Sequence, residues 1–174
     1  MLIGLVGRSR VGKDTVAQLL SDKYKLKRLA QPVKDACKVL YGWDDLIIES
    51  DMKEMKDEKW GITPRTAMVN LTNSIKKLNG PDFFIRKFFD TWDGMPTIIP
   101  DVRYVTDVNE IHSRGGITIK IIRDAGPRHE FENEIDDITT TFTIYNNDGV
   151  PDLIERVTEM KTVLQLASAL QRGC

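Results

Sequence analysis

The sequence predicts an α/β protein in which a parallel β-sheet is covered by helices on both faces. Short apolar runs alternate with stretches whose apolar residues recur at helical spacing. A G-x-x-x-x-G-K motif, Gly7 to Lys13, lies between the first apolar run and the first helical stretch. Strands that alternate with helices favour a parallel sheet with right-handed crossovers, so the carboxyl ends of all strands should share one edge. Ligands bind at that edge in such folds.

Each element follows from a local pattern. The expected strands are residues 2–6, 26–30, 97–101, 117–122 and 142–145, which are apolar runs bounded by Gly or polar residues. The expected helices begin at Lys13, Pro32, Pro64, Phe83, Val105 and Pro151, and Gly80-Pro81 ends the third of them. Residues 47–60 interleave Lys with acidic residues, which predicts an exposed helix or a mobile insert.

Length and composition bound the function. The chain has 174 residues, which fits one domain, and 41% hydrophobic with 29% charged residues is ordinary for a soluble protein. With 25 Lys and Arg against 26 Asp and Glu, the net charge of −1 gives no broad basic surface for duplex nucleic acid. No apolar run approaches the ~20 residues that span a bilayer. Cys37 and Cys174 form neither a disulfide framework nor a metal-binding spacing, so we expect a cytoplasmic protein.

The motif at residues 7–13, the phosphate loop, has the chemistry to hold a nucleoside triphosphate. Its glycines let the backbone curl so that successive N–H groups point at phosphate oxygens. The following helix adds the positive end of its dipole, and Lys13 should reach the β- and γ-phosphates. The residues expected to bind the nucleotide are Gly7, Arg10, Val11, Gly12, Lys13, Asp14 and Thr15.

The residue after Lys13 departs from the common motif, which has Ser or Thr there as a magnesium ligand. Asp14 occupies the position and Thr15 follows it. Asp14 either complements the dipole of the helix or points into the cleft, where it holds Mg²⁺ through water or contacts the acceptor. Thr15 offers a hydroxyl in a shifted register. Both are candidate metal residues, together with Asp101.

Several blocks of sequence, in the same order along the chain, resemble the phage-type deoxynucleoside monophosphate kinases of the P-loop nucleoside monophosphate kinase superfamily. These blocks cover nearly the whole chain. They are Gly7…Gly12-Lys13-Asp14-Thr15, Ala30-Gln31-Pro32-Val33-Lys34, Trp60-Gly61-Ile62-Thr63-Pro64-Arg65, Asp101-Val102-Arg103-Tyr104, Arg114-Gly115-Gly116, Arg123, His129 with Glu132, and Asn146-Asn147.

The resemblance implies a three-layer P-loop fold with a five-stranded parallel sheet. It also implies transfer of the ATP γ-phosphoryl group to a deoxynucleoside 5′-monophosphate with Mg²⁺, and it suggests a homodimer, in the host cytoplasm if the chain comes from a phage. Within one kinase domain (1–174), residues 31–92 would form a helical acceptor-binding region and residues 123–137 a small lid. Residues 71–73 and 76–77 depart from the family pattern, as does Thr106-Asp107, and these departures leave the base preference open.

Transfer between two anions needs cations from several elements. Arg103, just past the third expected strand, should grip the acceptor phosphate, although a surface salt bridge would explain it too. Asp101 holds Mg²⁺ through water, or orients Arg103 and Lys13, or else caps the following helix. Arg65 and Lys34 are candidate acceptor-binding residues, and solvent-facing side chains are the alternative for both.

Arg123 and Arg128 flank an acidic stretch and would close over ATP as lid residues that neutralise charge in the transition state. His129 fits a hydrogen-bonding lid residue better than a catalyst, and the acidic residues fit a solvated face. The catalytic set is therefore Lys13, Asp101, Arg103, Arg123 and Arg128.

Two alternatives remain at this point. The same loop could serve a kinase of another small acceptor, of the dephospho-coenzyme A kinase or shikimate kinase type. A nucleotide-dependent switch is the alternative from another class, although the sequence has no Asn-Lys-x-Asp guanine motif.

Overall fold

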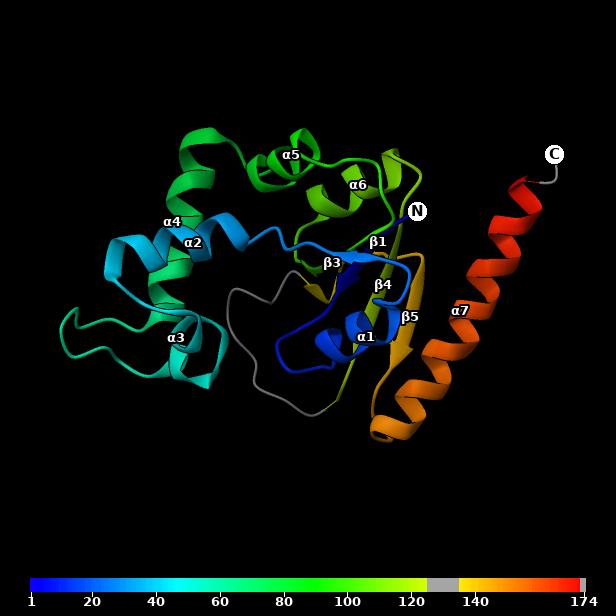
Figure 1. The fold of residues 1–174 in the computed structure, drawn as a ribbon, viewed down its shortest axis with the longest axis horizontal. Helices are drawn as coiled ribbons and strands as arrows, with labels where there is room; N and C mark the ends of the chain where they lie inside the picture. Colours follow the sequence, from blue (N-terminus) through cyan, green and yellow to red (C-terminus); the bar gives the residue numbers. More distant parts are fainter. Residues whose placement is uncertain (125–134, 173–174) are drawn as a thin grey trace. The chain divides into compact units, whose positions relative to one another are not determined.

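The computed structural model describes residues 1–124 and 135–172, and the predicted lid residues Arg128 and His129 lie outside these ranges. The chain divides into two compact units (Figure 1). The first unit contains Met1–Lys27 and Asp93–Cys174, and the second contains Arg28–Trp92. The second unit therefore covers almost the same part of the sequence as the predicted acceptor-binding region, residues 31–92.

The first unit is built on a five-stranded sheet with the strand order β2-β3-β1-β4-β5. All neighbouring strands are parallel, which confirms the predicted α/β class. The strands are β1 (Leu2–Val6), β2 (Lys25–Leu26), β3 (Thr97–Val102), β4 (Ile117–Ile122) and β5 (Phe142–Tyr145). The helices of this unit are α1 (Lys13–Leu20), α6 (Val105–Ser113) and α7 (Val150–Arg172).

One face of the sheet forms the main core with α1 and α7. Successive side chains of a strand point to opposite faces, so Ile3 and Leu5 of β1 share a side. Both are fully buried in a cluster that includes Val16 and Leu20 of α1 and Val157 of α7. The helical spacing that predicted α1 from the sequence therefore corresponds to its buried face.

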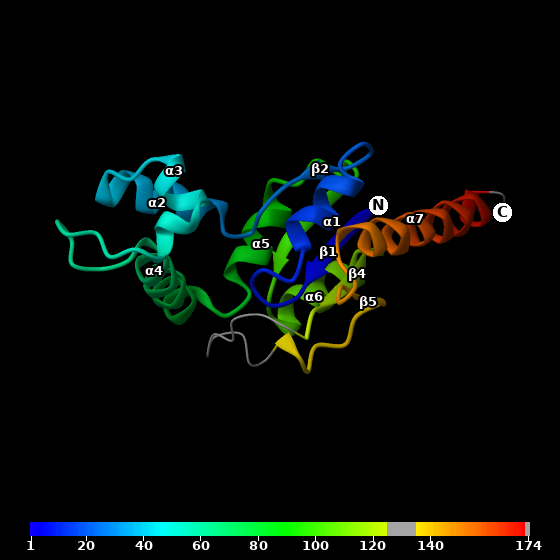
Figure 2. The same ribbon diagram turned by 90° about the horizontal axis from the view of Figure 1, so that it is seen from below.

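The opposite face of β1 is covered by α6, and the approach is close because residue 4 is glycine. A Cβ atom on Gly4 would lie 2.7 Å from Ile111 Cδ1 of α6 and 3.1 Å from Val102 Cγ2 of β3. Figure 2 shows α1 and α6 on opposite sides of β1. The first unit thus has helices on both faces of its sheet.

A bulge near the end of β3 shapes the edge where ligands would bind. Gly4 pairs with Ile99, whereas Val6 pairs with Val102, so β3 has one more residue than β1 between these pairs. Pro100 lies in this stretch and has no N–H to give to a ladder, which is why bulges tolerate proline. The bulge also includes Asp101, one of the predicted site residues.

The C-terminal helix α7 begins with an ion pair in its first turns. Arg156 Nε lies 2.5 Å from Asp152 Oδ2, four residues earlier, and Leu153 and Val157 are buried.

Within the described residues, no helix combines the length and the apolar character that crossing a membrane requires.

The second unit is helical within its described residues. It contains α2 (Gln31–Tyr41), α3 (Asp45–Glu49), a 3₁₀ helix η1 (Asp51–Glu54), α4 (Pro64–Asn79) and α5 (Phe83–Asp90). Side-chain caps fix two of the helix starts: Asp44 accepts the Ile47 N–H at 2.9 Å, and Thr63 accepts the Thr66 N–H at 3.1 Å.

An aromatic cluster organises the turn that follows η1. Tyr41 stacks on Trp43 with ring centroids 4.3 Å apart, and the Trp43 indole donates to Asp57 at 2.7 Å. Hydrogen bonds from this indole and from the Trp60 backbone hold the pKa of Asp57 below its usual value. Cys37 is buried, and burial raises the pKa of its thiol, which fits a packing residue.

Two expectations about elements need correction. The strand expected at 26–30 is wrong in extent, because β2 spans only Lys25–Leu26 and Ala30 is already the N-cap of α2. The charged stretch 47–60, expected as an exposed helix or a mobile insert, does not form one continuous helix. It contains part of α3, then η1, then a turn in which Asp57 accepts the Trp60 N–H at 3.0 Å.

Replacing Gly4 by Val should destabilise the first unit by about 1–3 kcal/mol, because the new side chain must displace Ile111 or its neighbours in a packed layer. Urea denaturation of the purified variant measures this loss. Gly4→Ala should lose less, because the Ile111 methyl that it meets is the end of a flexible side chain. Equal stability of Gly4→Val and the unsubstituted protein would contradict the close approach of α6.

Candidate active site

The phosphate loop connects β1 to α1 and has the backbone shape that an anion site needs. Arg10 and Gly12 have positive φ values of 61° and 105°, and Val11 lies between them. Alternation of left- and right-handed residues turns successive N–H groups toward a common point. Arg10 in this region carries strain of about 1–2 kcal/mol, as functional loops often do.

The loop lies close to the neighbouring strand β4. A Cβ atom on Gly7 would lie 2.6 Å from the Ile121 carbonyl oxygen, so only glycine fits where the chain leaves β1. At the other end of the loop, Gly12 is the N-cap of α1 and has no side chain to accept hydrogen bonds from the first helical turn. The first-turn amides of α1 therefore add to the donors that face an anion.

Lys13 folds back over its own loop. Its ammonium group donates to the Gly7 carbonyl at 2.7 Å and to the Arg8 carbonyl at 2.5 Å. The charge thus lies at the loop that would hold the triphosphate, where phosphate oxygens can replace the carbonyls as acceptors. The role of Lys13 in holding the phosphates stays a prediction.

The candidate metal residues come from two elements of the first unit. Asp14 is exposed in the first turn of α1, Thr15 is half-buried beside it, and Asp101 is half-buried in the bulge of β3. In residues 1–124 and 135–172 no three His, Cys, Asp or Glu side chains lie together as a metal cluster. Mg²⁺ in phosphoryl-transfer sites takes one or two protein ligands and completes its shell with phosphates and water, and one or two of these residues would suit it.

Parallel pairing brings other predicted residues to the same edge of the sheet. Val6 pairs with Val102 of β3 and with Lys120 of β4. Arg103 therefore follows β3 at the level where the phosphate loop follows β1. Arg123 is exposed and follows the end of β4. Lys13, Asp101, Arg103 and Arg123 thus belong to one edge of one unit.

Asp107 holds the turn that carries Arg103, and sequence analysis treated it only as a departure from the family pattern. Its side chain accepts the Arg103 N–H at 3.3 Å and the Tyr104 N–H at 3.2 Å. Asp107 is 3% exposed, and this capping of α6 explains its burial. An acidic residue three positions into an expected helix was the signal that could have revealed it.

A second missed contact ties the phosphate loop to the far end of the predicted lid. Arg8 makes a two-point ion pair with Asp136, at 3.1 Å from Nε to Oδ1 and 2.5 Å from Nη2 to Oδ2. The Lys120 ammonium donates to the Asp136 backbone carbonyl at 2.7 Å. Asp136 was expected in a solvated acidic face, and its side chain is indeed 61% exposed, while the pairing with Arg8 is an addition that the sequence did not indicate.

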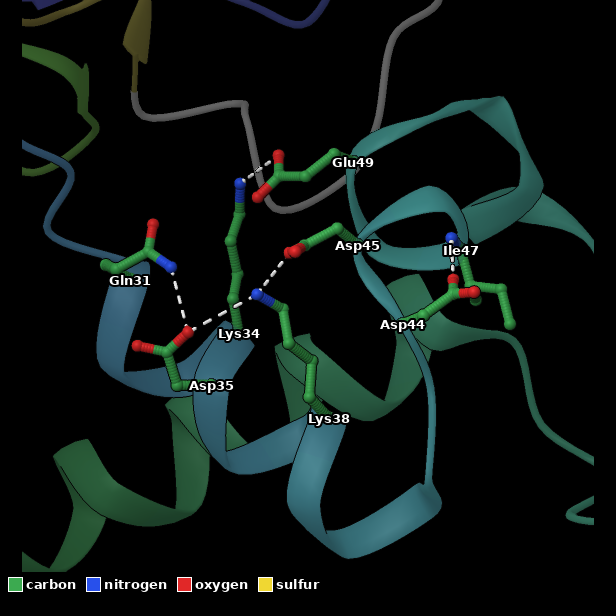
Figure 3. A network of polar contacts seen from close by, with 8 residues as sticks. All are labelled: Gln31, Lys34, Asp35, Lys38, Asp44, Asp45, Ile47 and Glu49. Atoms are coloured by element: carbon green, nitrogen blue, oxygen red, sulfur yellow. Dashed lines mark hydrogen bonds and ion pairs between the residues drawn. The ribbon is translucent and has the colours of Figure 1, made fainter.

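In the second unit, both predicted acceptor-binding residues are partly buried and paired with carboxylates. Lys34 of α2 lies 2.6 Å from Glu49 of α3, and its side chain is 14% exposed (Figure 3). Arg65 of α4 lies 2.5 Å from Glu54 of η1, and its side chain is 19% exposed. Neither side chain extends into solvent. One turn after Lys34, Lys38 pairs with Asp45, and this hydrogen bond raises the pKa of Lys38.

Lys53 of η1 is a third cation in this group, and sequence analysis did not single it out. Burial lowers its pKa, and so do the positive charges of Arg65 and Lys34. Lys53 is thus close enough to Arg65 and Lys34 to be repelled by both, and we call these three residues the cation group. The carboxylates of Glu54 and Asp51 act on Lys53 in the opposite sense. Because Lys34 and Arg65 are paired with carboxylates, an anionic ligand would have to compete for them. One Lys in a charged stretch carries no sequence signal that sets it apart.

The predicted residues therefore fall into two sets. Lys13, Asp14, Thr15, Asp101, Arg103 and Arg123 belong to the first unit, and Lys34 and Arg65 belong to the second. Each set is assembled within its own unit. A phosphate loop between the first strand and first helix of this parallel sheet defines the chain as a P-loop α/β protein.

Comparisons with known proteins found similar solved structures and no matching family. Neither a family model nor a curated protein matches the sequence. Among solved structures, the chain is similar to TT1252 from Thermus thermophilus, with 16% identity, a TM-score of 0.49, and 95% of this chain and 96% of that chain covered. It is also similar to shikimate kinase from Aquifex aeolicus vf5, with 14% identity, a TM-score of 0.49, and 97% and 98% covered. Neither similarity identifies an acceptor for this chain.

Replacing Lys53 by Met should stabilise the protein at pH 7. The pKa of Lys53 is lowered in the folded state, so the charged side chain disfavours folding below that pKa. This destabilisation disappears as the pH rises from the lowered pKa of Lys53 through the ordinary lysine value of about 10.4. Urea denaturation should therefore give Lys53→Met a larger free energy of unfolding than the unsubstituted protein at pH 7. The difference between the two proteins should be smaller at pH 10.

Lys56→Met is the matched control, because Lys56 is exposed in the same segment. Its effect should be small at both pH values. A Lys53→Met variant that is no more stable than the unsubstituted protein at pH 7 would show that the cation group carries no repulsion.

Proposed function

We propose that the chain is an ATP-dependent kinase that transfers the γ-phosphoryl group to a deoxynucleoside 5′-monophosphate, giving ADP and the diphosphate. The observation that carries the proposal is the phosphate loop with Lys13 on its carbonyls, at the same sheet edge as Arg103 and Arg123. The nucleotide acceptor is supported by the blocks that resemble deoxynucleoside monophosphate kinases and by the cation group of the second unit.

Each cation has a role that follows from its place. Lys13 neutralises charge on the β- and γ-phosphates, and the loop amides hold the same groups. Arg103 grips the acceptor phosphate, and Arg123 neutralises charge in the transition state. Arg128, which lies outside the described residues, would share that role by its position in the sequence. Lys34 and Arg65 bind the acceptor by exchanging Glu49 and Glu54 for its phosphate oxygens.

Proton transfer needs little help from the protein. An acceptor phosphate is already ionised at pH 7, so its oxygen can attack the γ-phosphorus without a general base while the bond to the β–γ bridging oxygen breaks. Mg²⁺ would neutralise and orient the phosphates when bound. Asp14, Thr15 and Asp101 are the residues that would hold it.

A kinase of a different small anionic acceptor is the second candidate. The cation group favours any ligand that carries a phosphate or carboxylate, because Lys34 and Arg65 already bind carboxylates within the unit. Dephospho-coenzyme A and shikimate both belong to this class of acceptor.

An acceptor screen tests the proposal. ATP and Mg²⁺ are combined with dAMP, dGMP, dCMP, dTMP, their ribose counterparts, shikimate or dephospho-coenzyme A, and ADP release is followed in a coupled assay. At least one deoxynucleotide should stimulate turnover. Lys13→Ala should reduce that turnover by about 10²-fold or more while its circular dichroism stays unchanged, because Lys13 lies on the loop and outside the core.

The other outcomes separate the alternatives. Phosphorylation of shikimate or dephospho-coenzyme A alone would replace the nucleotide acceptor by the second candidate. ATP hydrolysis that no acceptor stimulates would indicate a nucleotide-dependent switch. Retention of turnover within about tenfold in Lys13→Ala would remove Lys13 from the catalytic set.

A further inference from the structure

Asn146 makes an unusual contact with the middle of the phosphate loop. It follows the last residue of β5 and is only 7% exposed. Its side-chain Nδ2 donates to the Val11 carbonyl at 2.9 Å, across 135 positions of the sequence. The acceptor is a carbonyl oxygen, so the group that faces it must be the amide NH₂ and not the amide oxygen.

The sheet holds Asn146 in this position. Its backbone N–H donates to the Ile122 carbonyl at 2.8 Å, which continues the pairing of β5 with β4 by one residue. The end of β4 also lies against the start of the loop, where Gly7 approaches Ile121. Both ends of the phosphate loop are thus located by the same two strands.

Gly12 packs directly against the Asn146 side chain. A Cβ atom at residue 12 would lie 2.6 Å from Asn146 Nδ2 and 3.4 Å from Leu153 Cδ2 of α7, and the φ of Gly12 is +105°. Glycine is therefore required here by the neighbour as well as by the backbone.

The contact has a consequence for the next amide. The peptide bond between Val11 and Gly12 is planar and trans, so its C=O and N–H point in opposite directions. A Val11 carbonyl that is held toward the buried Asn146 side chain turns the Gly12 N–H away from the interior. We propose that Asn146 is a positioning residue for nucleotide binding, which fixes the Val11–Gly12 peptide so that the Gly12 N–H donates to a phosphate oxygen.

Without the Asn146 amide, this peptide can rotate, because the two positive-φ residues that flank Val11 offer other conformations of the loop. Nucleotide binding must then also order the Val11–Gly12 peptide, and the entropy lost in ordering it weakens the affinity for the nucleotide. This inference rests on the proposed function only in taking the phosphate loop as the nucleotide site. It requires no particular acceptor.

The neighbouring Asn147 provides a matched control. It is exposed, its Nδ2 donates to Asp124 Oδ2 at 2.5 Å, and its Oδ1 accepts the Asp124 N–H at 3.0 Å. Asn147 thus joins the segments after β4 and β5, as Asn146 does. Both of these hydrogen bonds join Asn147 to Asp124, outside the phosphate loop.

The first test compares Asn146→Ala with Asn147→Ala by calorimetric titration with ADP. Asn146→Ala should raise the Kd for ADP about tenfold and the KM for ATP by a similar factor, with kcat changed less than twofold, because ground state and transition state lose the same contact. Asn147→Ala should bind ADP within twofold of the unsubstituted protein. A role of Asn146 in stability alone would lower the melting temperature and leave the Kd of the folded variant unchanged, and that result would overturn the proposal.

The second test needs no variant, so it holds even if Asn146→Ala fails to fold. In ¹⁵N-labelled unsubstituted protein, the amide resonance of Gly12 should move strongly when ADP is added, whereas that of Gly94, an exposed turn residue, should stay in place. A Gly12 resonance that does not move at saturating ADP would overturn the proposal.

The two tests also separate this inference from the proposed function. A protein that binds ADP with these responses but phosphorylates no acceptor would retain the role of Asn146 and lose the kinase assignment. If Asn146→Ala phosphorylates a deoxynucleotide with unchanged Kd, KM and kcat, the kinase assignment is retained and the proposed role of Asn146 is lost. A chain that binds no ADP at all would overturn both.

Discussion

The path of the chain from β1 into α1 is the constraint on which the rest of the candidate site depends. The phosphate loop must leave a buried strand, expose its amides and start a helix within seven residues. Close packing makes this path unique, because Gly7 lies against Ile121 of β4 and Gly12 lies against Asn146 after β5. The parallel sheet therefore fixes the loop directly, and the loop in turn fixes Lys13.

The predicted cations of each unit are held by groups of the protein itself. Lys13 binds loop carbonyls, Lys34 binds Glu49, and Arg65 binds Glu54. Long cationic side chains lose rotamer freedom when they are held, so a ligand that meets them already ordered has a smaller entropic cost. The same ligand must compete with the resident carboxylates. Acceptor binding as proposed would exchange these partners, and a doubly charged phosphate would compete better than a weaker anion.

Sequence patterns predicted what is local and missed what depends on distant contacts. The periodic apolar residues of β1, α1 and α4 and the spacing of the phosphate loop located these elements, because each signal lies within one segment. The short β2, the capping role of Asp107 and the repulsion at Lys53 depend on partners from other segments. Asn146 was recognised only as part of a family block. Its role appears once β5 is placed beside β4 and the loop.

The short strand β2 explains how the second unit can be inserted without disturbing the sheet. The Lys25 N–H donates to the Pro96 carbonyl and the Lys27 N–H to the Ile98 carbonyl, so the chain leaves the first unit beside the point where it returns. An ion pair between Lys25 and Asp93 lies at the same place and lowers the pKa of the Asp93 carboxyl. Because both ends of the insertion are joined within the first unit, the sequence between them can change while the sheet and phosphate loop persist. A phosphate-loop motif therefore predicts the fold of the first unit, whereas it carries no information about the inserted second unit, where the proposed acceptor-binding residues Lys34 and Arg65 lie.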